Sequence, residues 1–342
     1  MRLHARIDHR LRAGLRRVGK ERLSLRPYRV NLEVTNRCNS HCTMCNRFHE
    51  RENEVQLSGF MSWGTVKKCE PLLRHATEAN LSGFGEPLLH PEFGEIARYV
   101  KARVRRVFFY TNAIALDENA AKMLIETGVD QVNVSIGAAD EATHRRIRGV
   151  ALGPIVENLR RLRDMKRSAG AATPEVHFEV VAFRSAIADM ENVVALAREL
   201  DVCAISLPHL VVHGDLIEES PWMAPSEAEE MFERAACHAR ERGVLLNPPS
   251  FNESRGECLL PYSDFTVAWD GRVMSCHREA YVVGDLRSAS AEEIWNGPEM
   301  RRLRRRIHDE GFEATCSGCT IWDHRGENFL HPREYSRSPE VS

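Results

Sequence analysis

Three cysteines stand within eight residues of one another near the start of the chain. Cys38, Cys42 and Cys45 follow a short β-rich run in the pattern Cys-x-x-x-Cys-x-x-Cys. Thiolates held this close in one loop are suitable ligands for a single compact metal centre. A structural zinc site normally closes with four protein ligands, whereas three leave one position open for a small molecule. The spacing therefore predicts a centre that binds and activates a ligand.

A second group of cysteines lies in the last third of the chain, at Cys258, Cys276, Cys316 and Cys319. Between the first two, Asp270 and Gly271 separate two β-like runs, which is a strong hairpin signal. We expect this hairpin to bring Cys258 and Cys276 together at its open end. On spacing alone, four thiols delivered in this way could also close a tetrahedral zinc site.

The composition is that of an ordinary globular protein. The chain has 342 residues, of which 43% are hydrophobic and 28% charged, with a net charge of -2. This charge gives no reason to expect nucleic acid as the main partner, and no apolar run approaches the roughly 18 residues that span a bilayer. We expect a cytoplasmic protein, in which ten cysteines indicate metal or redox chemistry rather than disulfides.

The elements that must position the first cysteine loop alternate between strand and helix. We expect strands at 30–34, 78–81, 107–110, 131–136, 176–182 and 204–207, with helices at 63–73, 91–102, 117–127, 154–169 and 189–200. This alternation predicts a parallel α/β sheet with right-handed crossovers, either open or closed into an incomplete barrel. Function sits at the carboxyl ends of such strands, which is where the cysteine loop falls.

A basic amphipathic helix is expected before the first strand. Apolar residues recur at spacings of three and four among ten Arg or Lys within residues 1–29, as Leu3, Ile7, Leu11, Leu15 and Val18. Such a helix either packs across the main domain or docks on a membrane surface.

The first cysteine loop resembles the signature of the radical S-adenosylmethionine (SAM) enzymes. In that family three cysteines hold a [4Fe-4S] cluster, and the amino and carboxylate groups of SAM take its fourth iron. The resemblance covers roughly residues 28–215 and implies a partial (β/α)6 TIM-like barrel. It also implies cofactor contacts from Met44, Gly83, Gly85, Glu86, Thr111, Asn112, Ser135 and Arg148.

Physical chemistry agrees with part of this set. Glycine lets backbone approach a ligand closely, and a carboxylate such as Glu86 pairs with an ammonium. The chain departs from the family after the fourth strand, where Ser135-Ile136-Gly137-Ala138 replaces the usual Ser-Ile-Asp-Gly. No acidic partner of Ser135 is therefore expected. Arg148 pairs with the cofactor carboxylate or, equally well, ends a helix in solvent.

The C-terminal cysteines resemble the auxiliary-cluster region of many radical SAM enzymes, called the SPASM domain or, when shorter, the twitch domain. The spacing is closest to the twitch type, as in 2-deoxy-scyllo-inosamine dehydrogenase. Four cysteines imply one auxiliary [4Fe-4S] cluster ligated only by protein. We thus expect a basic helix at 1–28, the barrel at 29–225, the auxiliary-cluster domain at 226–325 and a polar tail at 326–342.

The resemblance implies a reaction class. An electron donor such as flavodoxin or ferredoxin reduces the first cluster, SAM is cleaved to a 5'-deoxyadenosyl radical, and the radical takes a hydrogen atom from substrate. An auxiliary cluster could accept a further electron, which favours dehydrogenation. Because residues 1–28 are too short for the peptide-recognition domain of many maturases, we expect a small polar substrate: a sugar, aminocyclitol or nucleoside.

Alternatives to this reaction are an epimerase, a decarboxylase, a peptide maturase and, more distantly, a non-catalytic zinc-binding regulatory protein. His209 and His213 follow the sixth strand and are candidates for the base of an oxidation. The competing interpretation is that both histidines pack or form hydrogen bonds within a linker.

Overall fold

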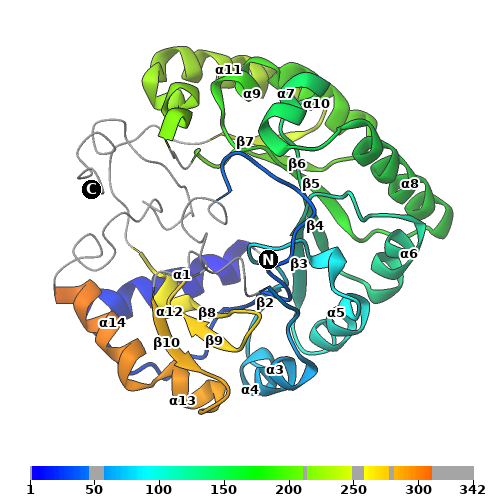
Figure 1. Cartoon of the computed structure of the whole chain (residues 1–342). Coiled ribbons are helices and arrows are strands. Elements are labelled where there is room, and N and C mark those ends of the chain that lie inside the picture. The colour runs from blue at the N-terminus through cyan, green and yellow to red at the C-terminus, as the bar shows by residue number, and fades with distance from the viewer. Residues whose placement is uncertain (1, 46–57, 211–213, 249–257, 277–280, 310–342) are drawn as a thin grey trace.

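A computed structural model describes residues 2–45, 58–210, 214–248, 258–276 and 281–309 of the chain. Strands curve in an arc with helices along its outer side (Figure 1). Three of the predicted site residues, His213, Cys316 and Cys319, lie outside the described residues, as does the expected tail at 326–342.

The described residues place ten strands in one sheet, in the order β10-β9-β8-β1-β2-β3-β4-β5-β6-β7. Seven parallel strands follow one another along the chain: β1 (Arg29–Leu32), β2 (Glu78–Asn80), β3 (Arg106–Thr111), β4 (Gln131–Ser135), β5 (Glu175–Glu179), β6 (Ala204–Ser206) and β7 (Leu245–Asn247). The six predicted strands are confirmed as β1 to β6. The seventh, β7, was not predicted; it lies at the edge of the sheet with two of its three residues exposed, so little apolar burial marks it.

The helices of the arc connect these strands. They are α3 (Trp63–Lys68), α4 (Glu70–Leu73), η1 (Pro87–Leu89), α5 (Phe93–Lys101), α6 (Glu118–Thr127), α7 (Glu141–Arg148), α8 (Gly153–Ala169), α9 (Arg184–Ala188), α10 (Met190–Glu199), η2 (Gly214–Glu219), η3 (Pro221–Met223) and α11 (Pro225–Glu241). Sequence reasoning missed α7, which is almost entirely polar. Its ends carry the usual signals, since Asp140 accepts a hydrogen bond from Thr143 N and Gly149 adopts φ +71°.

The two faces of the sheet differ in polarity. Residues such as Val30, Leu32, Val176 and Phe178 are buried towards the helices. Because side chains alternate along a strand, their neighbours point to the concave face of the arc. That face carries polar side chains, for example Asn31, which is 4% exposed.

Ion pairs close the amino-terminal end of the concave face. Arg29 Nη2 lies 2.8 Å from Glu78 Oε2, and Arg106 Nη1 lies 3.1 Å from Glu78 Oε1. Asp264 is 3.7 Å from Arg29; partial burial lowers the pKa of this guanidinium, but the charges of Asp264 and Glu78 outweigh that effect and raise it. These residues begin four adjacent strands, so the opposite, carboxyl end is where a ligand would enter.

The C-terminal region extends the same sheet. The hairpin predicted around Asp270 is confirmed as β8 (Asp264–Val267) and β9 (Arg272–Met274), with Gly271 at φ +93°. Strand β10 (Val282–Asp285) follows on β9, whereas β8 pairs parallel with β1, from Arg29 opposite Asp264 to Leu32 opposite Val267. The sequence did not predict this pairing of strands far apart in the chain.

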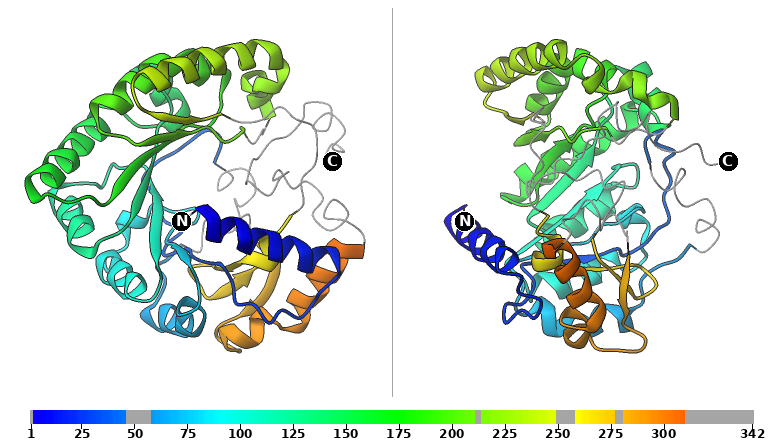
Figure 2. Two further views of the ribbon diagram at one scale, coloured as in Figure 1. Left: turned by 180° about the vertical axis from the view of Figure 1, so that it is seen from behind. Right: turned by 90° about the vertical axis from the view of Figure 1, so that its left-hand side faces the viewer.

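Helix α1 (Arg2–Arg17) packs against α12 (Leu260–Ser263) and α14 (Pro298–Asp309), and Figure 2 shows α1 alongside α14. Arg12, only 4% exposed, donates hydrogen bonds to the carbonyl oxygens of Tyr262 and Arg26. Of the predicted apolar stripe, Leu15 packs against the core, but Leu11 and Val18 are 55% and 74% exposed. The observed packing of α1 is therefore against α12 and α14 of the C-terminal region, with a buried arginine in place of part of the stripe.

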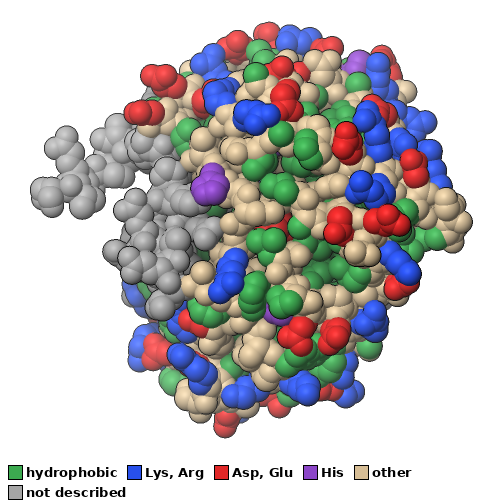
Figure 3. All heavy atoms as spheres, turned by 45° about the vertical axis from the view of Figure 1, so that its right-hand side comes forward, with side chains coloured by type: hydrophobic (Ala, Val, Ile, Leu, Met, Phe, Trp, Pro, Cys, Tyr) green, Lys and Arg blue, Asp and Glu red, His purple; other side chains and the backbone are tan. Residues whose placement is uncertain are grey.

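A further short helix, α13 (Ala291–Trp295), follows β10, and Ser290 forms a capping box with Glu293. Among the described helices, none has the length and apolar character needed to cross a membrane. Acidic and basic side chains are interspersed over the outer face seen in Figure 3.

Candidate functional site

The first cysteine loop follows β1 at the carboxyl end of the sheet and rests on the end of α7. Thr43 N donates to the carbonyl of Ile147 at 3.0 Å, and Ser40 Oγ donates to the carbonyl of Arg148 at 2.8 Å. A Cβ on Gly149 would stand 2.8 Å from the carbonyl oxygen of His41. The unpredicted helix α7 therefore supports the loop.

The three thiols of this loop are partly exposed and not in disulfides. Burial raises the pKa of the Cys38 thiol to about 11, so a metal must displace its proton. Two polar groups contact the sulfur atoms: Asn112 Nδ2 lies 3.8 Å from Cys38 Sγ, and Ser40 Oγ lies 3.2 Å from Cys42 Sγ. Hydrogen bonds of this kind stabilise thiolate ligands.

Glu86 connects three loops at the carboxyl end of the sheet. It is 2% exposed, and its Oε1 accepts hydrogen bonds from Thr111 Oγ1 at 2.7 Å and Leu88 N at 3.2 Å. Oε2 accepts from Asn112 N at 2.7 Å, and Glu86 N donates to the carbonyl of Arg37 at 2.7 Å. Burial raises the pKa of the carboxyl, although these hydrogen bonds oppose that shift. Within this structure, both oxygens of Glu86 serve the protein itself.

The glycine-rich motif brings backbone close to the segment after β1. A Cβ on Gly85 would lie 2.2 Å from the carbonyl oxygen of Thr35, and one on Gly83 would lie 2.3 Å from Glu33 Cγ. Glu33, 2% exposed, accepts from Phe84 N at 2.9 Å and from Trp269 N at 3.2 Å. Sequence reasoning missed Glu33, although a carboxylate directly after the first strand was a usable signal.

Asn112 and Thr111 occupy the turn after β3. Asn112 Nδ2 donates to Asn39 Oδ1 at 2.8 Å, and its Oδ1 accepts from Ile114 N at 3.0 Å. Thr111 Oγ1 accepts from Ala113 N at 2.9 Å, and Ala113 has φ +57°. The turn therefore holds Asn112 between the cysteine loop and the end of β3.

Arg148 ends α7 and reaches the same region. Its charge acts on the carboxyls of Glu86 and Glu179, lowering the pKa of each, although burial outweighs it in both. Burial lowers the pKa of His144 to about 4, and the charge of Arg148 adds to this effect. Arg148 Nε is buried with no hydrogen-bond partner among the described residues. This leaves a donor for an anionic group such as a carboxylate.

The remaining predicted residues are dispersed. Ser135 ends β4 on the concave face, and Met44 packs against the hydrophobic core. His209 is 2% exposed, with its ring centroid 5.8 Å from that of Trp222. Its backbone forms an isolated parallel bridge with that of Ala182, which alternation along the strand places on the same buried face as Phe178 and Val180. The packing interpretation of His209 therefore fits the structure better than a catalytic one.

The described C-terminal cysteines lie near one end of the β8–β9 hairpin. Cys276 comes two residues after β9, and the register of the pairing puts it opposite Asp264. Cys258 precedes α12, which leads directly into that residue. Both thiols are partly exposed and not in disulfides.

The chemistry of the site fits a cluster with a bound cofactor. Three partly exposed thiols in one loop supply soft ligands, and the amide of Asn112 lies against one of their sulfur atoms. The unsatisfied Nε of Arg148 suits a carboxylate.

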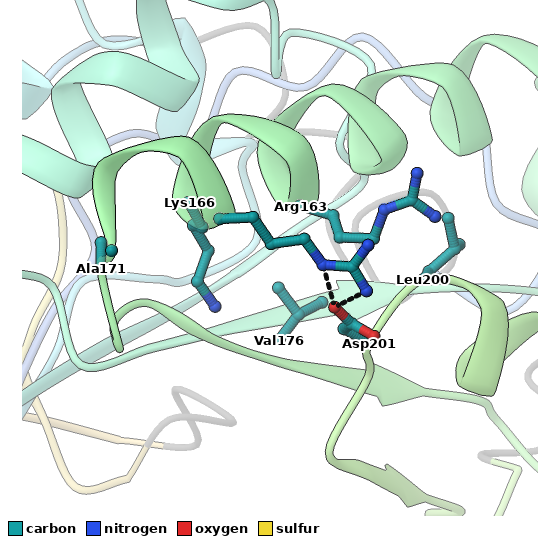
Figure 4. A pocket seen from close by; sticks show the side chains of 8 residues that line it. Arg163, Lys166, Ala171, Val176, Leu200 and Asp201 are labelled. Carbon is teal, nitrogen blue, oxygen red and sulfur yellow. Dashed lines mark hydrogen bonds and ion pairs between the residues drawn. The ribbon is translucent and has the colours of Figure 1, made fainter.

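A surface pocket lies away from this site, at the amino ends of β5 and β6. It is bordered by Lys166 and the Arg167–Asp201 ion pair (Figure 4).

Two family models match the chain. The model of the radical SAM superfamily matches residues 32–202, which hold the cysteine loop and the glycine-rich motif. The chain belongs to the radical SAM superfamily. The SPASM model, an iron-sulfur cluster-binding domain, matches residues 258–320 of this radical SAM enzyme. Its cofactors are therefore a [4Fe-4S] cluster and SAM, with auxiliary iron-sulfur chemistry in the SPASM region.

Curated relatives of this radical SAM enzyme include a tungsten-containing aldehyde ferredoxin oxidoreductase cofactor-modifying protein from Pyrococcus furiosus. It is 26% identical over 321 residues, covering 85% of this chain and 87% of the relative. A PqqA peptide cyclase from Gluconobacter oxydans is 26% identical over 286 residues, covering 79% and 76%. Streptococcus suis SuiB, solved with the precursor peptide SuiA, shares the fold with a TM-score of 0.64 at 11% identity, covering 86% of this chain and 70% of SuiB.

Proposed function

We propose that this radical SAM enzyme modifies a peptide by oxidation. The observation that carries the proposal is the similarity to a PqqA peptide cyclase over 79% of the chain. SuiB adds support, because the same fold accommodates a precursor peptide there. A peptide therefore takes precedence over the sugar, aminocyclitol or nucleoside expected from the sequence. That expectation rested on the short N-terminal segment, which leaves recognition by a separate protein open.

When bound, the cluster and SAM supply a 5'-deoxyadenosyl radical that takes a hydrogen atom from the substrate. We assign Cys38, Cys42 and Cys45 as the ligands of that cluster. Asn112 orders the loop through Asn39 and contacts the sulfur of Cys38. Arg148, whose buried Nε has no hydrogen-bond partner among the described residues, would donate to the SAM carboxylate.

The glycine-rich motif has a different part in the proposal. Gly83 and Gly85 allow close packing of the loops after β1 and β2. Glu86 holds these loops to Thr111 through its hydrogen bonds. It retains capacity to accept from an ammonium, because a carboxylate has about four acceptor sites. Ser135 and Met44 remain candidates for SAM contacts on their positions alone, and Cys258, Cys276, Cys316 and Cys319 for the auxiliary cluster.

A second candidate is modification of a cofactor. The relative from Pyrococcus furiosus, which aligns over 85% of this chain, carries that role in its name. Peptide and cofactor differ in their sensitivity to protease, which gives a direct test.

The test uses full-length protein, purified anaerobically with its clusters reconstituted, reduced with dithionite and supplied with SAM. Extract from cells that carry the gene is added before and after protease digestion, and 5'-deoxyadenosine is measured. The proposal predicts stimulation that digestion removes, and an oxidised peptide two hydrogens lighter by mass spectrometry. Stimulation that survives digestion would favour the cofactor instead. The Cys42→Ala variant is the control and should form no 5'-deoxyadenosine.

A further inference from the structure

Glu179 is the last residue of β5, and its Cα lies opposite Ser135 of β4 and Ser206 of β6. Phe178 and Val180, on either side of it in the chain, are both fully buried in the hydrophobic core. Because side chains alternate along a strand, Glu179 faces the concave side of the sheet. The carboxylate therefore stands at the carboxyl end of the strands, where the cysteine loop also lies.

The pairing register places Glu179 in a row of polar residues across the concave face. Thr111 pairs with Val134, so the next residue on each strand, Asn112 and Ser135, are also level with each other. On the other side, Ser206 is paired with Asn247 of β7. The row thus runs from the residue that touches Cys38 to the edge of the sheet. Glu179 is its only carboxylic acid.

The charged surroundings of Glu179 come from separate elements. Arg148 at the end of α7 attracts it electrostatically, and Tyr110 on β3 is close enough that Glu179 helps raise the pKa of the phenol. The flanking residues on β4 and β6 are serines, which carry no charge. Burial outweighs the attraction of Arg148 and raises the pKa of Glu179 to about 7. Such a group exchanges protons readily at neutral pH.

We propose that Glu179 accepts the proton released when the substrate is oxidised. The inference rests on the proposed oxidation. One hydrogen atom leaves a substrate C–H bond and forms the new C–H bond of 5'-deoxyadenosine. The substrate radical then gives one electron to an acceptor of the iron-sulfur class and one proton to the Glu179 carboxylate. The substrate has then lost two hydrogens in total.

Three full-length variants test this role. Glu179→Gln keeps the shape of the side chain but removes the base, and Glu179→Asp keeps a shortened base. Glu175→Gln is the matched control, since Glu175 lies on the same strand and face but at the exposed amino end. For each variant, 5'-deoxyadenosine and oxidised product are measured separately from pH 5.5 to 9, using whichever fraction of the extract stimulates the wild type.

In the wild type, the rate of product formation should rise through about pH 7, where Glu179 deprotonates. Glu179→Gln should still cleave SAM, yet form product about a hundredfold more slowly and without that rise. Glu179→Asp should recover part of the rate, and Glu175→Gln should match the wild type. Equal product rates in wild type and Glu179→Gln overturn the inference. Equal loss of SAM cleavage and product also overturns it, because that result assigns Glu179 to cofactor binding.

A measurement without turnover provides a second criterion. Infrared difference spectra of protein with isotope-labelled glutamate should show a carboxyl that titrates near pH 7 and disappears in Glu179→Gln. Absence of that band also overturns the inference. Failure of the peptide proposal has a different signature, namely wild-type stimulation that resists protease. The Glu179 comparison is then made with that protease-resistant substrate.

Discussion

Replacement of Glu86 by alanine should destabilise the protein even when no cofactor is present. The carboxylate is 2% exposed and accepts from the backbone N–H groups of Leu88 and Asn112 and from the Thr111 hydroxyl. The hydroxyl rotates to find another acceptor, but the two N–H groups cannot. Each buried N–H left unsatisfied costs about 1 to 3 kcal/mol. The variant also avoids the desolvation cost of burying a carboxylate, which offsets part of this penalty. We therefore expect the free energy of unfolding to fall by about 3 kcal/mol.

Glu86→Gln gives an intermediate case. An amide oxygen in place of Oε1 still serves Leu88 and Thr111, but the amide nitrogen then faces the N–H of Asn112. Two donors in contact leave one N–H unsatisfied, and we expect a loss of about 1 to 2 kcal/mol. Glu126→Ala is the control, because that side chain is 55% exposed and its ion pair with Lys122 spans 3.9 Å. It should change the stability by less than about 0.5 kcal/mol.

The assay is urea unfolding of full-length, cluster-free protein under reducing conditions, followed by circular dichroism at pH 7. The order of stability should be wild type, then Glu86→Gln, then Glu86→Ala. If Glu86→Ala unfolds within about 0.5 kcal/mol of the wild type, the scaffolding role inferred from the hydrogen bonds is wrong. SAM binding that is lost at unchanged stability would then favour the interpretation drawn from the sequence, in which Glu86 pairs with the ammonium of the cofactor.

Gly85→Ala should cost about 1 to 3 kcal/mol and lower the iron content after reconstitution, because its Cβ would stand 2.2 Å from the Thr35 carbonyl oxygen. Gly153→Ala, which meets nothing within 4 Å, should leave both measurements unchanged. For Glu179, the raised pKa means that the folded state favours the protonated carboxyl, so stability falls as pH rises from 4.5 through about 7. Glu179→Gln should therefore gain up to about 3 kcal/mol on the wild type over that range in urea titrations, and parallel curves would contradict this. Arg12→Met should cost about 2 kcal/mol and expose α1 to protease, because the buried carbonyl of Tyr262 and the partly buried carbonyl of Arg26 lose their donor. Protease resistance equal to that of the wild type would show that α1 does not depend on Arg12.

Local sequence signals predicted the strands of the arc but not how the sheet extends. The six predicted strands carry apolar residues on the face that the helices cover. This pattern can be recognised in each strand separately, without knowing which strand lies next to it. Strand β7 has three residues at an edge, two of them exposed, so little apolar burial marks it. The pairing of β8 with β1 joins residues more than 230 positions apart, and no periodicity within either segment encodes it.

The site divides in the same way. Cysteine spacing and glycines that must approach backbone leave marks in the sequence, and the cysteine loop and Gly85 lie where those marks predict. The role of Glu86 could not be predicted, because the sequence does not distinguish a glutamate that accepts hydrogen bonds from three protein donors from one that binds a ligand. Glu179 was missed for a related reason. A single glutamate at a strand end becomes notable only when the register aligns it with Asn112 and Ser135.

The pairing of β8 with β1 also bears on electron transfer. Strand β1 leads into the first cysteine loop, β8 follows Cys258, and Glu33 ties the end of β1 to Trp269 beyond β8. Backbone hydrogen bonds thus join the support of the first cysteine loop and the support of Cys258 and Cys276 in one continuous strip of sheet. We expect the separation between redox centres held on them to stay constant during turnover, so that electrons need not wait for a domain to close. Distance measurements by pulsed electron paramagnetic resonance should give one narrow distribution, with and without SAM, and two distributions would reveal a hinge.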